Sequence, residues 1–194
     1  MAPAGPPAAV TAPDPACITT TVSATVGSVV WSGCLVHDVQ TDPVTLDVTD
    51  VTVRVDGRVD WNGTTGVTSW NVAESLAMTM TSGPDVMTGS ATIGLSGAIT
   101  IKDGQIKGST ASNVSSTASF MGYSATAAMR TSMVVDLAYL PEPFCVTTGT
   151  LTLEQVWTRR PAGATAANYP DQGWKLTWTG DGITCGQVSV AHGQ

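Results

Sequence analysis

The chain has 194 residues, of which 42% are apolar, 12% charged and 6% aromatic. This length and apolar content suffice for one domain with a core and exclude an intrinsically disordered chain. The formal net charge is -7, with only eight Lys and Arg residues. The chain therefore lacks the basic surface with which proteins bind nucleic acids or anionic membranes.

The chain divides into three segments by composition. Residues 1–16 are rich in Pro and Ala and contain no apolar signal core, so they are interpreted as an extended linker, or alternatively as a disordered mature terminus. Residues 17–191 form a single predicted all-β domain, followed by a tail of residues 192–194. The longest uncharged stretch, Gly108 to Met129, consists mostly of Ser, Thr, Ala and Gly, so no transmembrane segment is predicted.

Strand periodicity dominates from Val44 to Tyr139, where apolar residues alternate with polar ones. Turn dipeptides interrupt this pattern at regular intervals: Asn62-Gly63, Gly83-Pro84, Asp103-Gly104 and Met121-Gly122. The sequence therefore predicts an antiparallel meander of five strands, each about 17 residues long and roughly 55 Å in length. A competing turn at Asp56-Gly57 would reverse the alternation, so the strand is expected to continue through it.

The turns also predict which residues pair. A two-residue turn at Asn62-Gly63 would place Val55 opposite Trp70, and the alternation of Val44 and Leu46 then requires a β-bulge near Thr49 and Asp50. The later turns place Met80 opposite Met87, Gly97 opposite Trp70, Ile101 opposite Ile106 and Phe120 opposite Tyr123.

Such long strands have a consequence for the fold. Sheets twist, and one apolar face must be covered, yet no segment of useful length has helical periodicity. The sequence therefore predicts a sheet rolled into a barrel, a flattened barrel or a sandwich.

The two ends of the chain resemble each other and contain all four cysteines. Cys17-Ile-Thr-Thr recurs as Cys145-Val-Thr-Thr, and Trp-Thr-Gly or Trp-Ser-Gly precedes each second cysteine, Cys34 and Cys185. Two disulfide hairpins, Cys17 with Cys34 and Cys145 with Cys185, are the preferred pairing, and bridges between the two repeats are the alternative. Disulfides indicate an oxidising compartment, so an exported protein is expected, extracellular, on the cell surface or periplasmic.

The segments Cys-Val-Thr-Thr-Gly-Thr-Leu-Thr and Cys-Gly-Gln-Val resemble uncharacterised bacterial secreted proteins and lipoproteins with Cys-bracketed β-hairpins. The resemblance covers the two end segments only. It implies export from the cell and no particular activity.

Several side chains on the predicted apolar face are flexible or small, where a filled core would use Leu and Ile. Met side chains recur there, and Glu74 is the one carboxylate. The predicted bulge is expected to turn Glu74 toward water. The alternative is that Glu74 is buried and anchors the polar group of a ligand. These positions are the candidates for lining a site for an apolar ligand: Glu74, Leu76, Met78, Met80, Met87, Ile93, Leu95, Met129 and Met133.

Signals for catalysis, metals and cofactors are lacking. The histidines, His37 and His192, lie in no recognisable catalytic motif. Asp56 and Asp60 stand between Arg54 and Arg58, which favours a solvated charge ladder over a calcium site. The interpretation is a non-enzymatic protein without a cofactor.

The irregular segment from Arg159 to Gly173 is a candidate for partner contact, because long loops in compact domains are often functional. Its candidate residues are Arg159, Arg160 and Tyr169. The expected function is an exported binding protein that holds a lipid or another elongated apolar molecule. The alternative is a structural or adhesive surface module that self-associates through its sheet edges.

Overall fold

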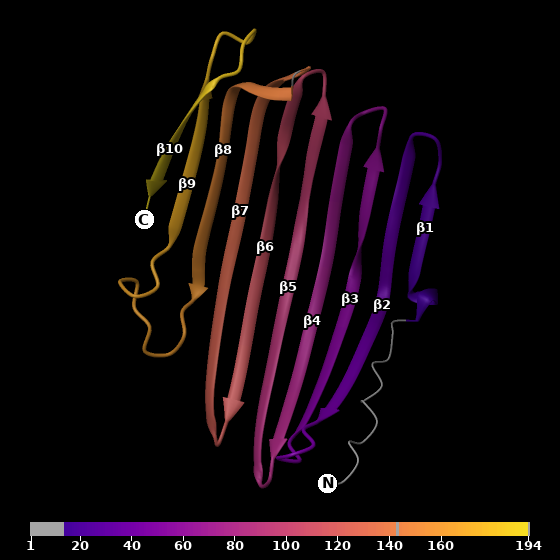
Figure 1. The fold of residues 1–194 in the computed structure, drawn as a ribbon, viewed down its shortest axis with the longest axis vertical. Helices are drawn as coiled ribbons and strands as arrows, with labels where there is room; N and C mark the ends of the chain where they lie inside the picture. Colours follow the sequence, from indigo (N-terminus) through magenta and orange to yellow (C-terminus); the bar gives the residue numbers. More distant parts are fainter. Residues whose placement is uncertain (1–13, 143, 194) are drawn as a thin grey trace.

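A computed structural model describes residues 14–142 and 144–193, and these residues form one ten-stranded antiparallel sheet (Figure 1). A short 3-10 helix, η1 (Pro15–Cys17), precedes the first strand. The strands are β1 (Ile18–Val22), β2 (Val26–Thr41), β3 (Val48–Asn62), β4 (Val67–Ser82), β5 (Asp85–Lys102), β6 (Gln105–Phe120), β7 (Tyr123–Pro141), β8 (Phe144–Arg159), β9 (Gln172–Thr179) and β10 (Gln187–Gly193).

The strands follow one another in chain order across the sheet, so the predicted meander is confirmed. Its five expected strands correspond to β3 through β7, and the two ends of the chain add β1–β2 and β8–β10 to the same sheet. Strands β2 through β8 contain 15 to 19 residues each, which agrees with the predicted strand length.

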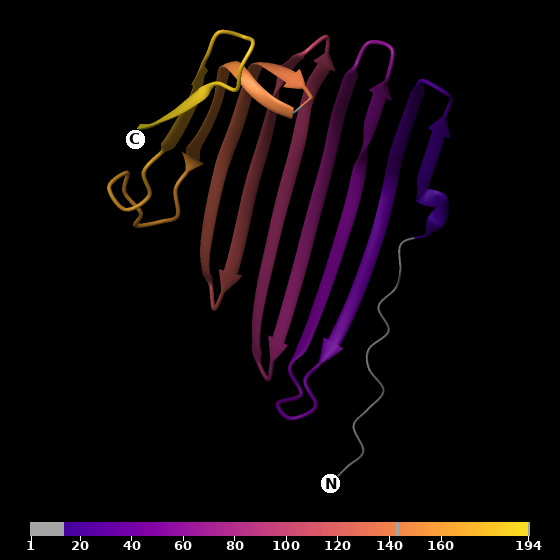
Figure 2. The same cartoon turned by 45° about the horizontal axis from the view of Figure 1, so that its top comes forward.

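The sheet does not close. Among the described residues no ladder joins β1 to β10, and no second layer packs on either face (Figures 1 and 2). The structure therefore gives an open single sheet in place of the expected barrel or sandwich. Of the expected N-terminal linker, residues 1–13 lie outside the described residues, as does Gln194 of the expected tail.

Three of the four predicted turns set the predicted register. Met80 pairs with Met87, and Trp70 with Gly97. Ile101 lies opposite Ile106, and Phe120 opposite Tyr123. Strand β3 also passes straight through Asp56 and Gly57, as expected.

The turn at Asn62-Gly63 is longer than predicted. Asn62 pairs with Val67, so four residues form the loop and Val55 lies opposite Glu74, not Trp70. The side-chain oxygen of Asn62 accepts hydrogen bonds from the amides of Thr64 and Thr65 at 3.0 and 3.1 Å. Backbone bonds from Gly63 to Thr25 and from Ile101 to Gly66 hold the loop between its neighbours, and a two-residue turn would lose them.

The predicted bulge at Thr49 and Asp50 is absent, because the β3–β4 register is continuous from Val48 to Asn62. Val44 and Leu46 instead lie in an exposed loop before β3. That loop is organised by Asp42, whose carboxylate accepts hydrogen bonds from the amides of Val44 and Thr45.

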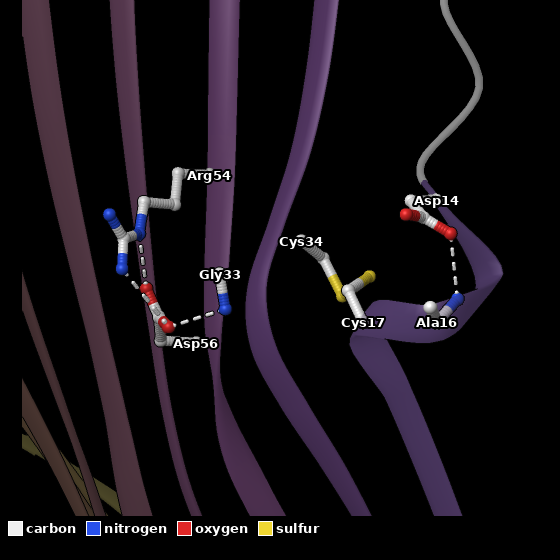
Figure 3. Close-up of a disulfide and its surroundings, with 7 residues drawn as sticks. All are labelled: Asp14, Ala16, Cys17, Gly33, Cys34, Arg54 and Asp56. Atoms are coloured by element: carbon white, nitrogen blue, oxygen red, sulfur yellow. Dashed lines mark hydrogen bonds and ion pairs between the residues drawn. A yellow bond between two sulfur atoms is a disulfide. The ribbon is translucent and has the colours of Figure 1, made fainter.

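Register shifts occur at three other places: between Trp31 and Cys34 in β2, between Ala128 and Met129, and between Ala138 and Tyr139 in β7. At the first of these, Gly33 adopts a φ of 62°, a conformation that favours glycine. Its N–H donates to the Asp56 carboxylate at 2.6 Å, next to the Cys17–Cys34 disulfide (Figure 3).

Both preferred disulfide pairings are confirmed. Cys17 bonds to Cys34 and Cys145 to Cys185, with Cα–Cα separations of 5.2 and 5.5 Å. The first bridge brackets the β1–β2 hairpin, and the second ties the start of β8 to the loop after β9. Each bridge therefore anchors one end of the sheet.

The core is small. Among the described residues, the buried apolar side chains are Cys34, Val135 and Leu137, and the buried polar one is Thr147. Three of these four residues lie near the β7–β8 turn, whose tip bends out of the plane of the sheet (Figure 2). The accessible surface of the chain is 12363 Å², whereas a compact monomer of 19.9 kDa exposes about 8,700 Å².

Candidate functional site: the apolar face of the sheet

Because side chains alternate across each strand, the register divides the sheet into two chemically different faces. We call the side on which Val53, Leu76, Ile93 and Val135 lie the apolar face, and the opposite side the polar face. Most of the large side chains on the apolar face are half-buried by their neighbours alone. Others are more open, including Leu95 at 42% and Ile101 at 53% exposure.

Charge is segregated between the two faces. Every Lys and Arg within a described strand falls on the polar face: Arg54, Arg58, Lys102, Lys107, Arg130, Arg159 and Lys175. Away from the turns, the charged side chains that the described strands place on the apolar face are Asp38 and Glu74. The apolar face thus combines a wide hydrocarbon surface with two isolated carboxylates.

Asp38 lies on this face near the C-terminal end of β2, opposite Val51. Its Oδ2 accepts a hydrogen bond from Gln40 Nε2 at 2.7 Å, whereas its Oδ1 is buried without a hydrogen-bond partner in the described part of the chain. A buried acceptor of this kind is costly unless a donor reaches it.

Glu74 is half-buried and lies between Val55 and Ile93 on the two neighbouring strands. The expectation that a bulge turns it toward water is therefore wrong, because the uninterrupted register keeps it on the apolar face. Its carboxylate is surrounded on both sides by branched aliphatic residues.

The predicted ligand-lining residues all share the apolar face. Leu76, Met78 and Met80 follow Glu74 along β4, with Met87, Ile93 and Leu95 on β5 and Met129 and Met133 on β7. Met80 and Met87 are direct cross-strand partners, and Gln155 Nε2 donates a hydrogen bond to Met129 Sδ at 2.6 Å. The residues form a band across the sheet, not the wall of an enclosed interior.

Two tryptophans on this face have room for their rings because a glycine stands beside each on the next strand. The Trp61 ring occupies the position that a Cβ of Gly27 would take, and a Cβ at Gly97 would lie 2.9 Å from Trp70 Cζ2. The predicted pairing of Gly97 with Trp70 thus leaves room for the indole.

The polar face carries the charge ladder expected from the sequence. Arg54 pairs with Asp56, and Arg58 with Asp60, each at 2.6 Å. The pKa of Asp56 is lowered from its ordinary value of 3.8 by the hydrogen bond from Arg54 and then by the Gly33 amide. The pKa of Asp60 is lowered by the hydrogen bond from Arg58.

A hollow of about 540 Å³ lies on the polar face beside this ladder, over Ala73 and Gly94. It is open and bordered by Arg54, Asp56 and Asn113. Further along the face, neighbouring hydroxyls bond to each other, Thr92 to Ser115 at 2.7 Å and Thr117 to Thr126 at 3.3 Å.

The candidate partner-contact loop between β8 and β9 is held by internal contacts. Arg160 donates to the Tyr169 carbonyl and to Asp171 Oδ1, both at 3.0 Å, and the Trp157 amide also donates to Asp171 Oδ1. The Tyr169 ring packs edge-on against Trp157 at a centroid distance of 5.5 Å. Arg160 and Tyr169 therefore stabilise the loop, while Arg159 lies at the end of β8 on the polar face.

The histidines lie far from any cluster of reactive groups. His37 bonds to Asp50 at 2.9 Å on the exposed polar face, and His192 packs against Trp174 near the end of β10. Within residues 14–142 and 144–193, no three His, Cys, Asp or Glu side chains gather closely enough to hold a metal ion. No helix in the described part of the chain is long and apolar enough to span a membrane.

No protein-family model, curated protein or solved structure matches this chain.

Proposed function

We propose that this protein is an exported, non-catalytic binding protein that holds a lipid or another elongated apolar molecule against the apolar face of its sheet. The observation that carries the proposal is the wide apolar face that the described residues leave open, combined with an exposed area well above that of a compact monomer. Large exposed apolar patches on soluble proteins are typical of binding sites.

The chemistry of the face favours an elongated apolar ligand. Flexible Met side chains adapt to a chain of variable shape, and the indoles of Trp61 and Trp70 offer large apolar rings for packing. Strands of this length offer about 50 Å in one direction, enough for an extended acyl chain.

Asp38 and Glu74 limit which polar groups such a ligand can carry. Both are acceptors on a face without Lys or Arg side chains in its strands, and Asp38 Oδ1 has no donor within the described residues. They favour an amphiphile with a hydroxyl or amine group over one with a phosphate or carboxylate.

Native mass spectrometry of the protein purified from its own source, followed by lipid analysis of a denaturing extract, tests the proposal. A stoichiometric apolar adduct on the protein supports it. A clean mass of the unliganded chain, together with no binding of a fluorescent fatty alcohol, would overturn it.

A matched pair of variants locates the site. Leu95→Asp places a charge on the apolar face, whereas Ser96→Asp places the same charge on the polar face of the same strand. Leu95→Asp is expected to weaken binding of the fatty alcohol about tenfold or more, since burial of a Leu side chain is worth about 1.5–3 kcal/mol. Equal affinities of the two variants would place the ligand elsewhere.

A further inference from the structure

The two edges of the sheet, β1 and β10, have unpaired outer sides in the described part of the chain. Their sequences, Ile-Thr-Thr-Thr-Val and Gln-Val-Ser-Val-Ala-His-Gly, contain no proline and no Lys, Arg, Asp or Glu. Val22 and Val190 are 66% and 64% exposed. Charged side chains and prolines are the usual means by which proteins block edge strands, and these edges use neither.

The two edges lie at the same level. The ladder that starts at Thr20 in β1 passes through Val29, Val59, Trp70, Gly97, Thr110, Met133, Leu153 and Trp174 and ends at His192 in β10. The register therefore accumulates no stagger across the ten strands. A barrel requires a stagger between the strands that it joins, so this sheet is not arranged to close on itself.

The hydrogen-bonding groups of the edges also match. Ser23 N–H donates to the Val26 carbonyl, which makes this pair hydrogen-bonded and fixes the alternation along β1. Ile18, Thr20 and Val22 consequently direct their own N–H and C=O groups outward. The same alternation, followed along the ladder from Thr20 to His192, directs the groups of Val188, Val190 and His192 outward from β10.

Strand direction completes the match. With ten alternating strands, β1 and β10 run in opposite directions (Figure 1). A second copy placed beside the first in the same orientation therefore presents its β1 antiparallel to β10, with the two apolar faces on the same side of the joint sheet.

We propose that copies of this chain associate head to tail, with β10 of one copy hydrogen-bonded to β1 of the next, Val190 opposite Val22 and His192 opposite Thr20. Sheet twist rotates each copy relative to the last, so the contact generates an open helical ribbon and not a closed ring. Between described residues the contact spans four residues of β1, Thr19–Val22 opposite 190–193, so it is weak for a single pair and depends on protein concentration. This association is independent of ligand binding on the apolar face.

Engineered cysteines test the pairing directly. Opposed residues of a hydrogen-bonded antiparallel pair have Cα atoms about 5.5 Å apart, which suits a disulfide. Full-length Val22→Cys protein mixed with full-length Val190→Cys protein and an oxidant such as diamide is expected to give a mixed disulfide dimer. Thr21→Cys is the matched control, because its side chain lies on the other face and its backbone groups point toward β2.

Three outcomes would overturn the proposal. One is an equal yield of mixed dimer from the Thr21→Cys control, and another is a predominance of Val22→Cys dimers with themselves. The third is a Val22→Cys/Val190→Cys double variant that forms only internally bridged monomers, since this would show a closed barrel.

A proline at the edge tests whether the cross-link depends on backbone hydrogen bonds between the two edges or forms by random collision of the cysteines. His192→Pro removes an outward N–H while leaving the bonds between β9 and β10, and proline is tolerated at such edge positions. In the Val190→Cys background, His192→Pro is expected to abolish the mixed dimer, whereas His192→Thr is expected to retain it. Retention of the cross-link in both variants would contradict hydrogen-bonded pairing of the edges.

Discussion

At the scale of single residues, the glycines differ in the space around them. Some lie so close to neighbouring backbone that a larger residue would clash, whereas others are surrounded by open space. A Cβ at Gly97 would lie 2.7 Å from the Ser109 carbonyl oxygen and 2.9 Å from Thr110 Cα. At Gly94, on the same strand but on the polar face, a Cβ would meet nothing within 4 Å. A side chain would therefore clash at Gly97 but would be accommodated at Gly94, three residues earlier.

Gly97→Ala is expected to destabilise the protein by about 1–3 kcal/mol, because the backbone around it cannot yield without shifting Trp70 and β6. Gly94→Ala is the matched control and is expected to be neutral or stabilising by up to about 1 kcal/mol, since it reduces the entropy of the unfolded chain. Urea unfolding of the two variants measures both effects. Equal losses would contradict the close approach at Gly97.

Asp56 joins two strands by accepting from the Arg54 side chain of β3 and the Gly33 amide of β2. Its folded pKa lies below 3.8, so its contribution to stability is present above that pH and is lost as the pH falls through the folded pKa. Asp56→Asn is therefore expected to reduce stability at pH 7 and to make less difference below about pH 3.

The pH dependence of urea midpoints, compared with that of Asp60→Asn, checks this expectation. Asp60 pairs with Arg58 but bonds no amide of β2, so its loss is expected to be smaller at neutral pH. A constant difference between Asp56→Asn and the wild type from pH 7 to pH 2.5 would contradict the role assigned to the charge.

At the scale of elements, the residues of a turn are enough to predict the register of its two strands where the turn makes no contacts with distant parts of the chain. Gly83-Pro84, Asp103-Gly104 and Met121-Gly122 each lie between directly paired residues, so the predicted pairs followed. The loop after Asn62 depends on backbone bonds to Thr25 and Ile101, which are distant in sequence. A pattern confined to neighbouring residues could not reveal them.

The error at Asn62 also explains the mistaken bulge. The predicted β3–β4 pairs are four residues away from the observed ones, so the end of β4 has to pair with Val44 and Leu46. These two residues then point to the apolar face only if a bulge reverses the alternation between them and Val51. From Val51 onward the predicted alternation agrees with the structure, so the candidate ligand-lining residues do share one face of the sheet. The glycine at position 33 could have indicated the true bulge in β2.

The disulfides act on whole elements by tying the ends of the sheet. Residues 145 and 185 are 40 apart in sequence, and residues 17 and 34 are 17 apart. On the chain-entropy model, Cys145→Ala/Cys185→Ala should reduce the free energy of unfolding by about 4 kcal/mol and Cys17→Ala/Cys34→Ala by about 3 kcal/mol. Urea unfolding under non-reducing conditions measures both losses, and a loss below about 1 kcal/mol for the first pair would contradict this anchoring role.

At the scale of the whole molecule, the sheet buries little surface for its size. The length and composition indicated a chain able to build a core, and periodicity indicated one apolar side, but neither property specifies what covers that side. A strand pattern is identical whether the covering layer is the same chain, another copy or a ligand. The predicted barrel is not confirmed, because closure depends on how far neighbouring strands are staggered along the sheet, and only the complete register of all strands reveals this stagger.

The exposed area leads to a thermodynamic prediction. A chain of 19.9 kDa exposes about 28,900 Å² when unfolded, so unfolding of this sheet exposes about four fifths of the area expected for a compact monomer. The urea m-value of the dilute, ligand-free protein is expected to fall below the compact value by the same proportion, about one fifth. An m-value equal to that of a compact protein of this mass would show that the apolar face is covered in solution.

The strictly sequential strand order has a consequence for how the chain reaches this structure. Each strand pairs with the strands next to it in the chain, so every hairpin can form before the rest of the sheet exists. Folding can then start at any of the two-residue turns and spread outward one strand at a time, as it does in repeat proteins. The growing sheet always presents its newest strand as an open edge, and the two disulfides hold the hairpin of β1 and β2 and the loop after β9 in place once they have formed.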